Sequence, residues 1–246
     1  MGLTQEQIDF FALNGYVAYG PILESGEVAE LREEYDRVFA EAERDGRFRN
    51  LAGSAEGGAP QERMLQIMQM CERSLPFRRL LYHERILDAV ESLIGPNLML
   101  FHDQALYKPA RTGGPIFWHQ DNAYWRCSPA NLVSCWLTLD DVDVANGAMQ
   151  VIPSSHLRPA HHETSAATNT LLESNLEGRE TEARVVELPA GGCMFHHCQT
   201  LHHTAPNRTD RQRRAFAIHY MPPGTRGRDG EPFRVNFAHP LLRARI

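Results

Sequence analysis

With 246 residues, of which 42% are hydrophobic and 23% charged, the chain is long enough to bury a core without disulfides or structural metals. Its net charge of −6 argues against a nucleic-acid-binding protein, which normally presents a basic face. No apolar run reaches the length of a membrane span, and the first residues lack the features of a signal peptide. We therefore expect a cytoplasmic protein whose five cysteines are reduced and mostly buried.

The chain opens with two predicted helices. Thr4 and Gln7 have the spacing of a capping box, and the helix that they begin ends at Gly15. Ser25 is placed to cap a second helix, which repeats apolar residues at helical spacing and ends at Gly46. The first third of the chain therefore favours helix.

The pattern then changes. Residues 52–60 are rich in Gly, Ala and Ser and predict a flexible loop, and a further helix is expected within 76–94. From Gly95 on, short apolar runs are separated by Pro and Gly. These runs predict strands at 98–107, 115–119, 131–139, 148–152, 184–188, 193–197 and 213–221. So many short strands indicate a sandwich, jelly roll or barrel.

We expect one domain over residues 1–246, with a helical part at 1–95, a β core at about 96–221 and a C-terminal tail at 222–246. The polar segment 157–183 interrupts the β pattern and contains few large apolar side chains. Because a loop of this length in a compact domain is usually functional, it predicts a lid over the mouth of a binding site.

The triplet His119-Gln120-Asp121 follows an apolar run, 116–118, that predicts a strand. Within a strand, His119 and Asp121 project to the same side because side chains alternate with a period of two. One imidazole and one carboxylate, joined by a second imidazole, form the facial triad of Fe(II) oxygenases, which leaves positions open for a co-substrate and O₂.

The second imidazole has four candidates: His196, His197, His202 and His203. His202 is favoured because it comes just after a predicted strand, where the mouth of a barrel lies. In addition, Arg213 follows eleven residues later at the start of the strand 213–221.

A dicarboxylate co-substrate needs a buried cationic fork, and arginine is the residue suited to it. Alternation divides the strand into two faces: Arg213, Ala215, Ala217 and His219 on one, and Arg214, Phe216, Ile218 and Tyr220 on the other. A ligand in a narrow barrel needs the face with small residues. We therefore expect Arg213 to point inward.

A rival metal-binding pattern is His161-His162-Glu163. It lies in the polar segment 157–183 and on no convincing strand. Since loops position ligands less well than strands do, a solvated loop is the favoured interpretation.

Further motifs follow one another in a specific order. They are the stretch from Thr4 to Gly20, Gly95-Pro96-Asn97, Lys108-Pro109, Trp118-His119-Gln120-Asp121, the block from Asn146 to Pro153, Ser155-His156 and the block from Gly192 to Tyr220. In this order and spacing, over most of the chain, they resemble the phytanoyl-CoA dioxygenase family. The resemblance implies a mainly β, cupin-like fold, a double-stranded β-helix (jelly roll) with flanking N-terminal helices, that binds Fe(II) and 2-oxoglutarate.

The resemblance also implies roles for single residues. The positions that match the iron ligands are His119, Asp121 and His202, and the match to the 2-oxoglutarate anchor is Arg213. Positions that line the family's co-substrate pocket are matched by Gln104, Trp136 and Thr204. Beyond the His-x-Asp triplet, Tyr124 and Trp125 are candidates for contact with the substrate, with ordinary aromatic packing as the alternative.

The activity that the resemblance implies is hydroxylation of a small organic substrate by O₂, with conversion of 2-oxoglutarate to succinate and CO₂. Halogenating relatives replace the metal carboxylate with a small residue, so Asp121 favours hydroxylation. Two alternatives stay open. One is a jelly-roll metalloenzyme that uses no 2-oxoglutarate, such as an isomerase or another dioxygenase, and the other is a non-enzymatic small-molecule binding module.

Overall fold

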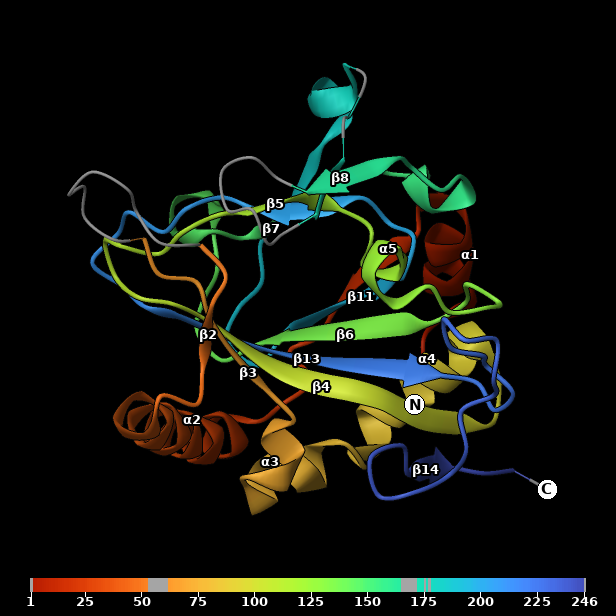
Figure 1. Ribbon diagram of the computed structural model, residues 1–246, viewed down its shortest axis with the longest axis horizontal. Helices are drawn as coiled ribbons and strands as arrows, with labels where there is room; N and C mark the ends of the chain where they lie inside the picture. The colour runs from red at the N-terminus through yellow and green to blue at the C-terminus, as the bar shows by residue number, and fades with distance from the viewer. Residues whose placement is uncertain (1, 53–61, 165–171, 175, 177, 246) are drawn as a thin grey trace.

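The computed structural model describes residues 2–52, 62–164, 172–174, 176 and 178–245. Its centre is a pair of facing antiparallel sheets, and helices cover the outer face of the larger one (Figure 1). The protein is therefore a mainly β jelly roll, as the sequence predicts.

The larger sheet contains, in spatial order, β1 (Tyr16–Tyr19), β11 (Cys193–His197), β6 (Val133–Thr138), β13 (Arg213–Met221), β4 (Leu98–Lys108), β3 (Leu65–Met68) and β2 (Arg49–Asn50), with β14 (Leu241–Arg243) paired to β4. The smaller sheet contains β10 (Arg184–Val186), β7 (Met149–Val151), β12 (His202–Thr204) and β5 (Ile116–His119). All predicted strands are present. The short strands β1, β2, β3, β12 and β14 were not predicted. Of these, β1, β2 and β3 add to the larger sheet within the part expected to be helical.

The first helix, α1 (Gln5–Asn14), begins with the expected capping box between Thr4 and Gln7 and ends at Gly15, whose φ of 79° suits a residue without a side chain. The second, α2 (Ser25–Asp45), shows that the predicted cap is wrong by one residue. Glu24 occupies the cap, and its backbone N–H donates to the Glu27 carboxylate at 2.8 Å. Ser25 is the first helical residue instead.

The helix expected within 76–94 is two helices, α3 (Leu75–Leu80) and α4 (Glu84–Ile94). The backbone N–H of Tyr82 bonds to the carbonyl of Arg79, three residues back, which tightens the last turn, and His83 is extended. An apolar stripe can continue across such a break, so the pattern of apolar residues in 76–94 did not reveal that the helix is divided. The shorter helices are η1 (Met70–Glu72), α5 (Asp121–Trp125), η2 (Val144–Asn146), η3 (Ser155–Leu157) and η4 (Arg179–Glu182).

Strand β13 is buried along its whole length because both of its faces are covered. On the outer face Phe216 packs edge-on against Phe77 of α3, with ring centroids 4.8 Å apart. Also on that face, Arg214 forms ion pairs with Asp140 at 2.7 Å and Asp36 at 2.9 Å. The predicted alternation of faces on this strand is therefore confirmed.

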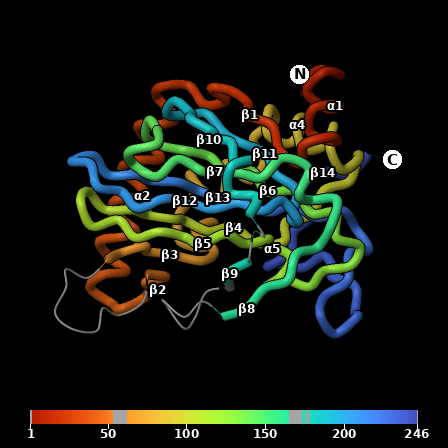
Figure 2. Tube along the Cα trace, turned by 90° about the horizontal axis from the view of Figure 1, so that it is seen from above, coloured from red at the N-terminus to blue at the C-terminus, as the bar shows by residue number. Residues whose placement is uncertain are grey.

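The segment 157–183 is not devoid of strands, contrary to our expectation. Strands β8 (His162–Thr164) and β9 (Leu172–Ser174) form a hairpin, and β9 lies beside β5 at the edge of the smaller sheet (Figure 2). Leu176 is buried with Ile152 and Leu201, which fixes the end of the segment to the core. Residues 165–171 lie outside the described part, as does most of the predicted loop 52–60.

The C-terminal tail returns to the larger sheet through β14, and the Arg243 guanidinium forms ion pairs with three carboxylates of α4. All five cysteines are free and buried, as expected. Among the residues that the structure describes, no helix combines the length and apolar character needed to cross a bilayer.

Candidate functional site

The two histidines of the predicted site lie side by side on two paired strands of the smaller sheet. His202 of β12 is the direct register partner of His119, the last residue of β5, and the ring centroids are 4.2 Å apart. Each Nδ1–H donates to the carbonyl two residues earlier in the chain, that of Phe117 at 2.8 Å and that of Thr200 at 2.9 Å. The tautomer of both rings is thereby fixed, and both Nε2 atoms are left as ligand atoms.

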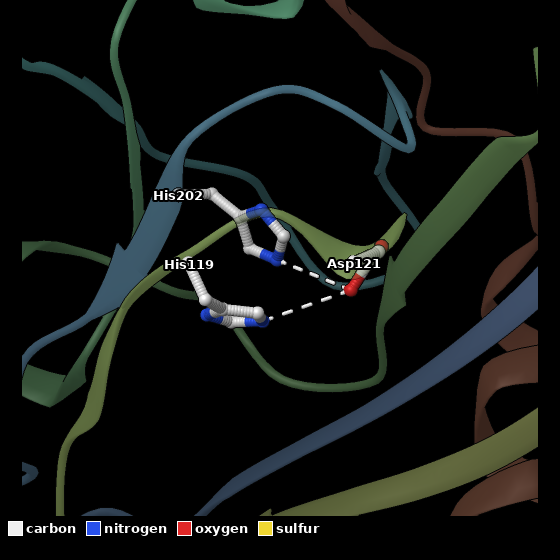
Figure 3. Close-up of side chains that lie close together, drawn as sticks. All are labelled: His119, Asp121 and His202. Carbon is white, nitrogen blue, oxygen red and sulfur yellow. Dashed lines mark ion pairs between the residues drawn. The ribbon is translucent and has the colours of Figure 1, made fainter. Parts of the chain in front are cut away.

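Asp121 joins them from a different element than predicted. The strand ends at His119, and Asp121 is the first residue of α5. Its Oδ1 lies 3.6 Å from Nε2 of His119 and 3.7 Å from Nε2 of His202 (Figure 3). The strand argument for their common side was therefore wrong, although the two side chains do converge.

These three residues can hold a metal ion. Their ligand atoms all lie within 4.8 Å of one another and the side chains are buried, and they form the one such group that the described residues contain. Burial alone would raise the pKa of Asp121, but the neighbouring imidazoles of His202, His119 and His196 hold that pKa well below its usual range. Two imidazoles and one carboxylate match the donor set that suits Fe(II) with open positions.

The larger sheet presents a polar row to this group. Strand register places His102, His219, Ser134 and His196 opposite one another on β4, β13, β6 and β11. The Ser134 hydroxyl and the His196 ring each lie 3.2 Å from Oδ2 of Asp121. Two residues further along the strands, the next row contains Gln104, Ala217 and Trp136.

Two buried cations lie opposite each other at one end of this face, Lys108 on β4 and Arg213 on β13. The Lys108 ammonium donates to three carbonyls, those of Gly114, Thr204 and Ala205. Its hydrogen-bonding capacity is therefore used up within the protein.

Arg213 differs from Lys108 because most of its donors are left unsatisfied by the residues that the structure describes. Its Nη2 contacts the Met64 sulfur at 3.7 Å, and the guanidinium lies 5.6 Å from the centre of the Trp136 ring. Its Nε and Nη1 have no hydrogen-bond partner in the described part of the chain, and neither has the buried hydroxyl of Thr204, which lines the same cavity. Burial lowers the pKa of Arg213 to about 10, so it stays charged at neutral pH. Such a site fits one end of a dicarboxylate.

All the predicted site residues line one cavity with a volume of about 370 Å³. This set contains His119, Asp121, His202, Arg213, Gln104, Trp136, Thr204, Tyr124 and Trp125. The sequence did not point to nine further lining residues: Arg49, Leu51, Met64, Gln66, Met68, His102, Leu106, Ile116 and Met149. His196 and His203, which also line the cavity, were considered only as metal ligands, and Ala217 and His219 were placed on the inward face of 213–221 without a role. Alternation from Arg213 was the available signal for Ala217 and His219, and β3 was missed altogether.

The rival pattern does not form a metal site. His161 and Glu163 are both more than four-fifths exposed and contact each other at 3.3 Å. The Nε2 of His162 accepts a hydrogen bond from the backbone N–H of Gln120 at 2.9 Å, so it has no free ligand atom to offer. Contrary to prediction, His162 and Glu163 lie on a strand, β8, but Glu163 is exposed there.

Comparison with known proteins agrees with this geometry. Phytanoyl-CoA dioxygenase of Rattus norvegicus, a peroxisomal protein, is 26% identical over 232 residues, which cover 89% of this chain and 68% of the relative. The nogalamycin-biosynthesis epimerase SnoN, described as non-heme and alpha-ketoglutarate dependent, is 28% identical with a TM-score of 0.80, over 98% of this chain and 96% of its own. SnoN has also been solved with Fe³⁺, alpha ketoglutarate and nogalamycin RO.

The carbocyclase SnoK from the same biosynthesis shares the fold, with a TM-score of 0.78 at 23% identity over 97% of this chain and 96% of its own. The family model described as phytanoyl-CoA dioxygenase matches residues 11–215, which is most of the sequence. The chain therefore belongs to the phytanoyl-CoA dioxygenase family.

Proposed function

We propose that this protein is an Fe(II)- and 2-oxoglutarate-dependent dioxygenase that hydroxylates a small organic substrate with O₂ and releases succinate and CO₂. The observation that supports it most directly is the pairing of two features in one cavity. One is the buried group His119, Asp121 and His202, and the other is the buried guanidinium of Arg213, whose Nε and Nη1 have no hydrogen-bond partner among the described residues. Family membership supports the same activity.

In this proposal His119, Asp121 and His202 would hold the iron in the cavity that they line. When bound, Fe(II) supplies the centre at which O₂ oxidises the keto acid and the substrate. The backbone carbonyls that accept from the two Nδ1–H groups fix the orientation of both imidazoles and direct both Nε2 atoms toward the metal position. Burial also lowers the pKa of His202, which keeps this ring in the ligating form.

Arg213 is proposed to bind the far carboxylate of 2-oxoglutarate. Its unpartnered Nε and Nη1 supply the donors, and the Thr204 hydroxyl supplies another. Trp136 lies against the guanidinium and Gln104 lies in the same row of the sheet, so both form walls of the co-substrate site. An anion that pairs with Arg213 in this buried place is shielded from water, which strengthens the interaction.

The substrate is proposed to enter past α5. Tyr124 is 40% exposed and its ring lies edge-on to His119, with centroids 5.7 Å apart, so it borders both the mouth and the metal site. Trp125 packs against Phe101 and His219, at 5.0 Å and 4.8 Å, and so combines aromatic packing with a place on the cavity wall. Tyr124 is therefore the better candidate for substrate contact.

A second candidate keeps the same site and changes the outcome of the oxidation. It rests on the likeness to SnoN, which is named an epimerase. Hydroxylation adds one oxygen atom to the substrate, whereas epimerisation leaves its mass unchanged, so mass spectrometry of the product distinguishes them. A metalloenzyme that uses no 2-oxoglutarate would need no cation at Arg213, and a simple binding module would need no intact group of His119, Asp121 and His202.

The metal-site assignment is tested by comparing two carboxylates. Asp121→Ala should abolish succinate formation from 2-oxoglutarate by the iron-loaded protein, because it removes a buried ligand and its charge. Glu163→Ala should leave the rate within about threefold, because an exposed carboxylate contributes little. Equal losses in the two variants would contradict the assignment.

The co-substrate assignment is tested by two neighbouring arginines. Arg213→Ala should keep metal binding but weaken 2-oxoglutarate binding by about two orders of magnitude, since a charge-assisted hydrogen bond contributes about 1.5–3 kcal/mol and about 1.4 kcal/mol is tenfold. Arg214→Ala, which loses the ion pairs with Asp140 and Asp36 on the other face, should instead lower the free energy of unfolding. Isothermal titration and urea denaturation separate the effects, and a larger co-substrate defect in Arg214→Ala would refute the assignment.

The segment 157–183 is proposed to act as a lid. The hairpin formed by β8 and β9 lies beside β5, and His162 contacts the backbone between the two metal-site residues of the His-x-Asp triplet. Hydrogen exchange of the β8 and β9 amides should slow when metal, 2-oxoglutarate and substrate are bound. Identical exchange in the free and the bound protein would show that the hairpin is fixed structure.

A further inference from the structure

The two carboxylate oxygens of Asp121 have different surroundings. Oδ1 faces the ligand atoms of His119 and His202. Oδ2 faces away from them and accepts hydrogen bonds from the hydroxyl of Ser134 and from Nε2–H of His196, both at 3.2 Å. One oxygen is therefore occupied by the protein, and the other is left for a metal.

The bond from Ser134 is the end of a longer chain of hydrogen bonds. Ser134 accepts from Nδ1–H of His219 at 2.7 Å, which directs its own hydroxyl hydrogen to Asp121. Nε2 of His219 accepts from the side-chain amide of Gln104 at 2.9 Å, and the Gln104 carbonyl accepts from the amide of Gln66. With this assignment of hydrogens every contact in the chain is a hydrogen bond, and each donor points toward the carboxylate.

The residues that form this series of hydrogen bonds lie on strands of the larger sheet. Ser134 and His219 are register partners on β6 and β13, two central strands of the larger sheet, and both side chains are buried. Gln104 and Gln66 line the cavity from β4 and β3. The series of hydrogen bonds thus links the cavity wall to the Oδ2 side of the Asp121 carboxylate through residues whose positions the larger sheet fixes.

We propose that Ser134, His219 and Gln104 are positioning residues for the metal carboxylate. They hold Oδ2 of Asp121 so that the carboxylate offers the metal a single oxygen in a fixed direction. This inference rests on the proposed function, because it concerns the group that would hold the iron. Hydrogen-bonding partners of metal ligands commonly change metal affinity by about 10–100-fold when they are removed.

The test is titration of the metal-free protein with Co(II), followed by its visible absorption and by calorimetry. Ser134→Ala should weaken Co(II) binding by about tenfold. It should also change the absorption spectrum, because a carboxylate that is free to rotate can bind through both oxygens. His219→Leu should act in the same direction, whereas His219→Asn, which keeps an N–H toward Ser134, should act less.

Thr138→Val is the matched control. Thr138 lies on the same strand and the same face as Ser134 and is equally buried, but its hydroxyl donates to the carbonyls of Pro189 and Gly192. The Thr138→Val variant should have a lower free energy of unfolding but an unchanged affinity for Co(II) and an unchanged absorption spectrum. Unchanged affinity and spectrum in Ser134→Ala would overturn the positioning role. Failure of the unaltered protein to bind Co(II) would instead overturn the proposed function.

Discussion

The rest of the structure depends on one buried carboxylate, Asp121. An ionised carboxylate inside a protein is costly unless charges or hydrogen bonds compensate it. Here the compensation comes from both sheets. The larger sheet supplies hydrogen bonds from Ser134 and His196, and the smaller sheet places His119 and His202 beside Oδ1, where a metal bound by all three residues would compensate the charge. The two sheets must therefore face each other in one relative position for the site to exist. The fold and the proposed chemistry depend on each other through this position.

The two buried cations differ in that Lys108 has a structural role and Arg213 can bind a ligand. Lys108 and Arg213 are neighbours on paired strands and are equally buried, yet only Lys108 has its donors satisfied. A buried donor without an acceptor costs free energy, so the unpartnered guanidinium is explained best by an anion that arrives from outside. A dicarboxylate with one end on a metal and the other on Arg213 fits the shared cavity.

Local periodicity in the sequence allowed part of the fold and of the site to be predicted. The two faces of 213–221 followed from alternation, because the strand is long and regular. The spacing of Thr4 and Gln7 alone predicted the start of the first helix. Asp121 was placed on the right side for the wrong reason, since a spacing of two does not distinguish the end of a strand from the start of a helix. The bonds from Ser134 and His219 depend on register between strands far apart in the sequence, which no local pattern encodes.

The central claim is that one cavity binds both a metal and 2-oxoglutarate. It is tested most directly by adding Fe(II) and then 2-oxoglutarate to the protein without oxygen, while the visible absorption is recorded. The account predicts a metal-to-ligand charge-transfer band that saturates at one 2-oxoglutarate per chain and is absent from the Asp121→Ala variant. Tight binding of Fe(II) without any such band at saturating 2-oxoglutarate would contradict it.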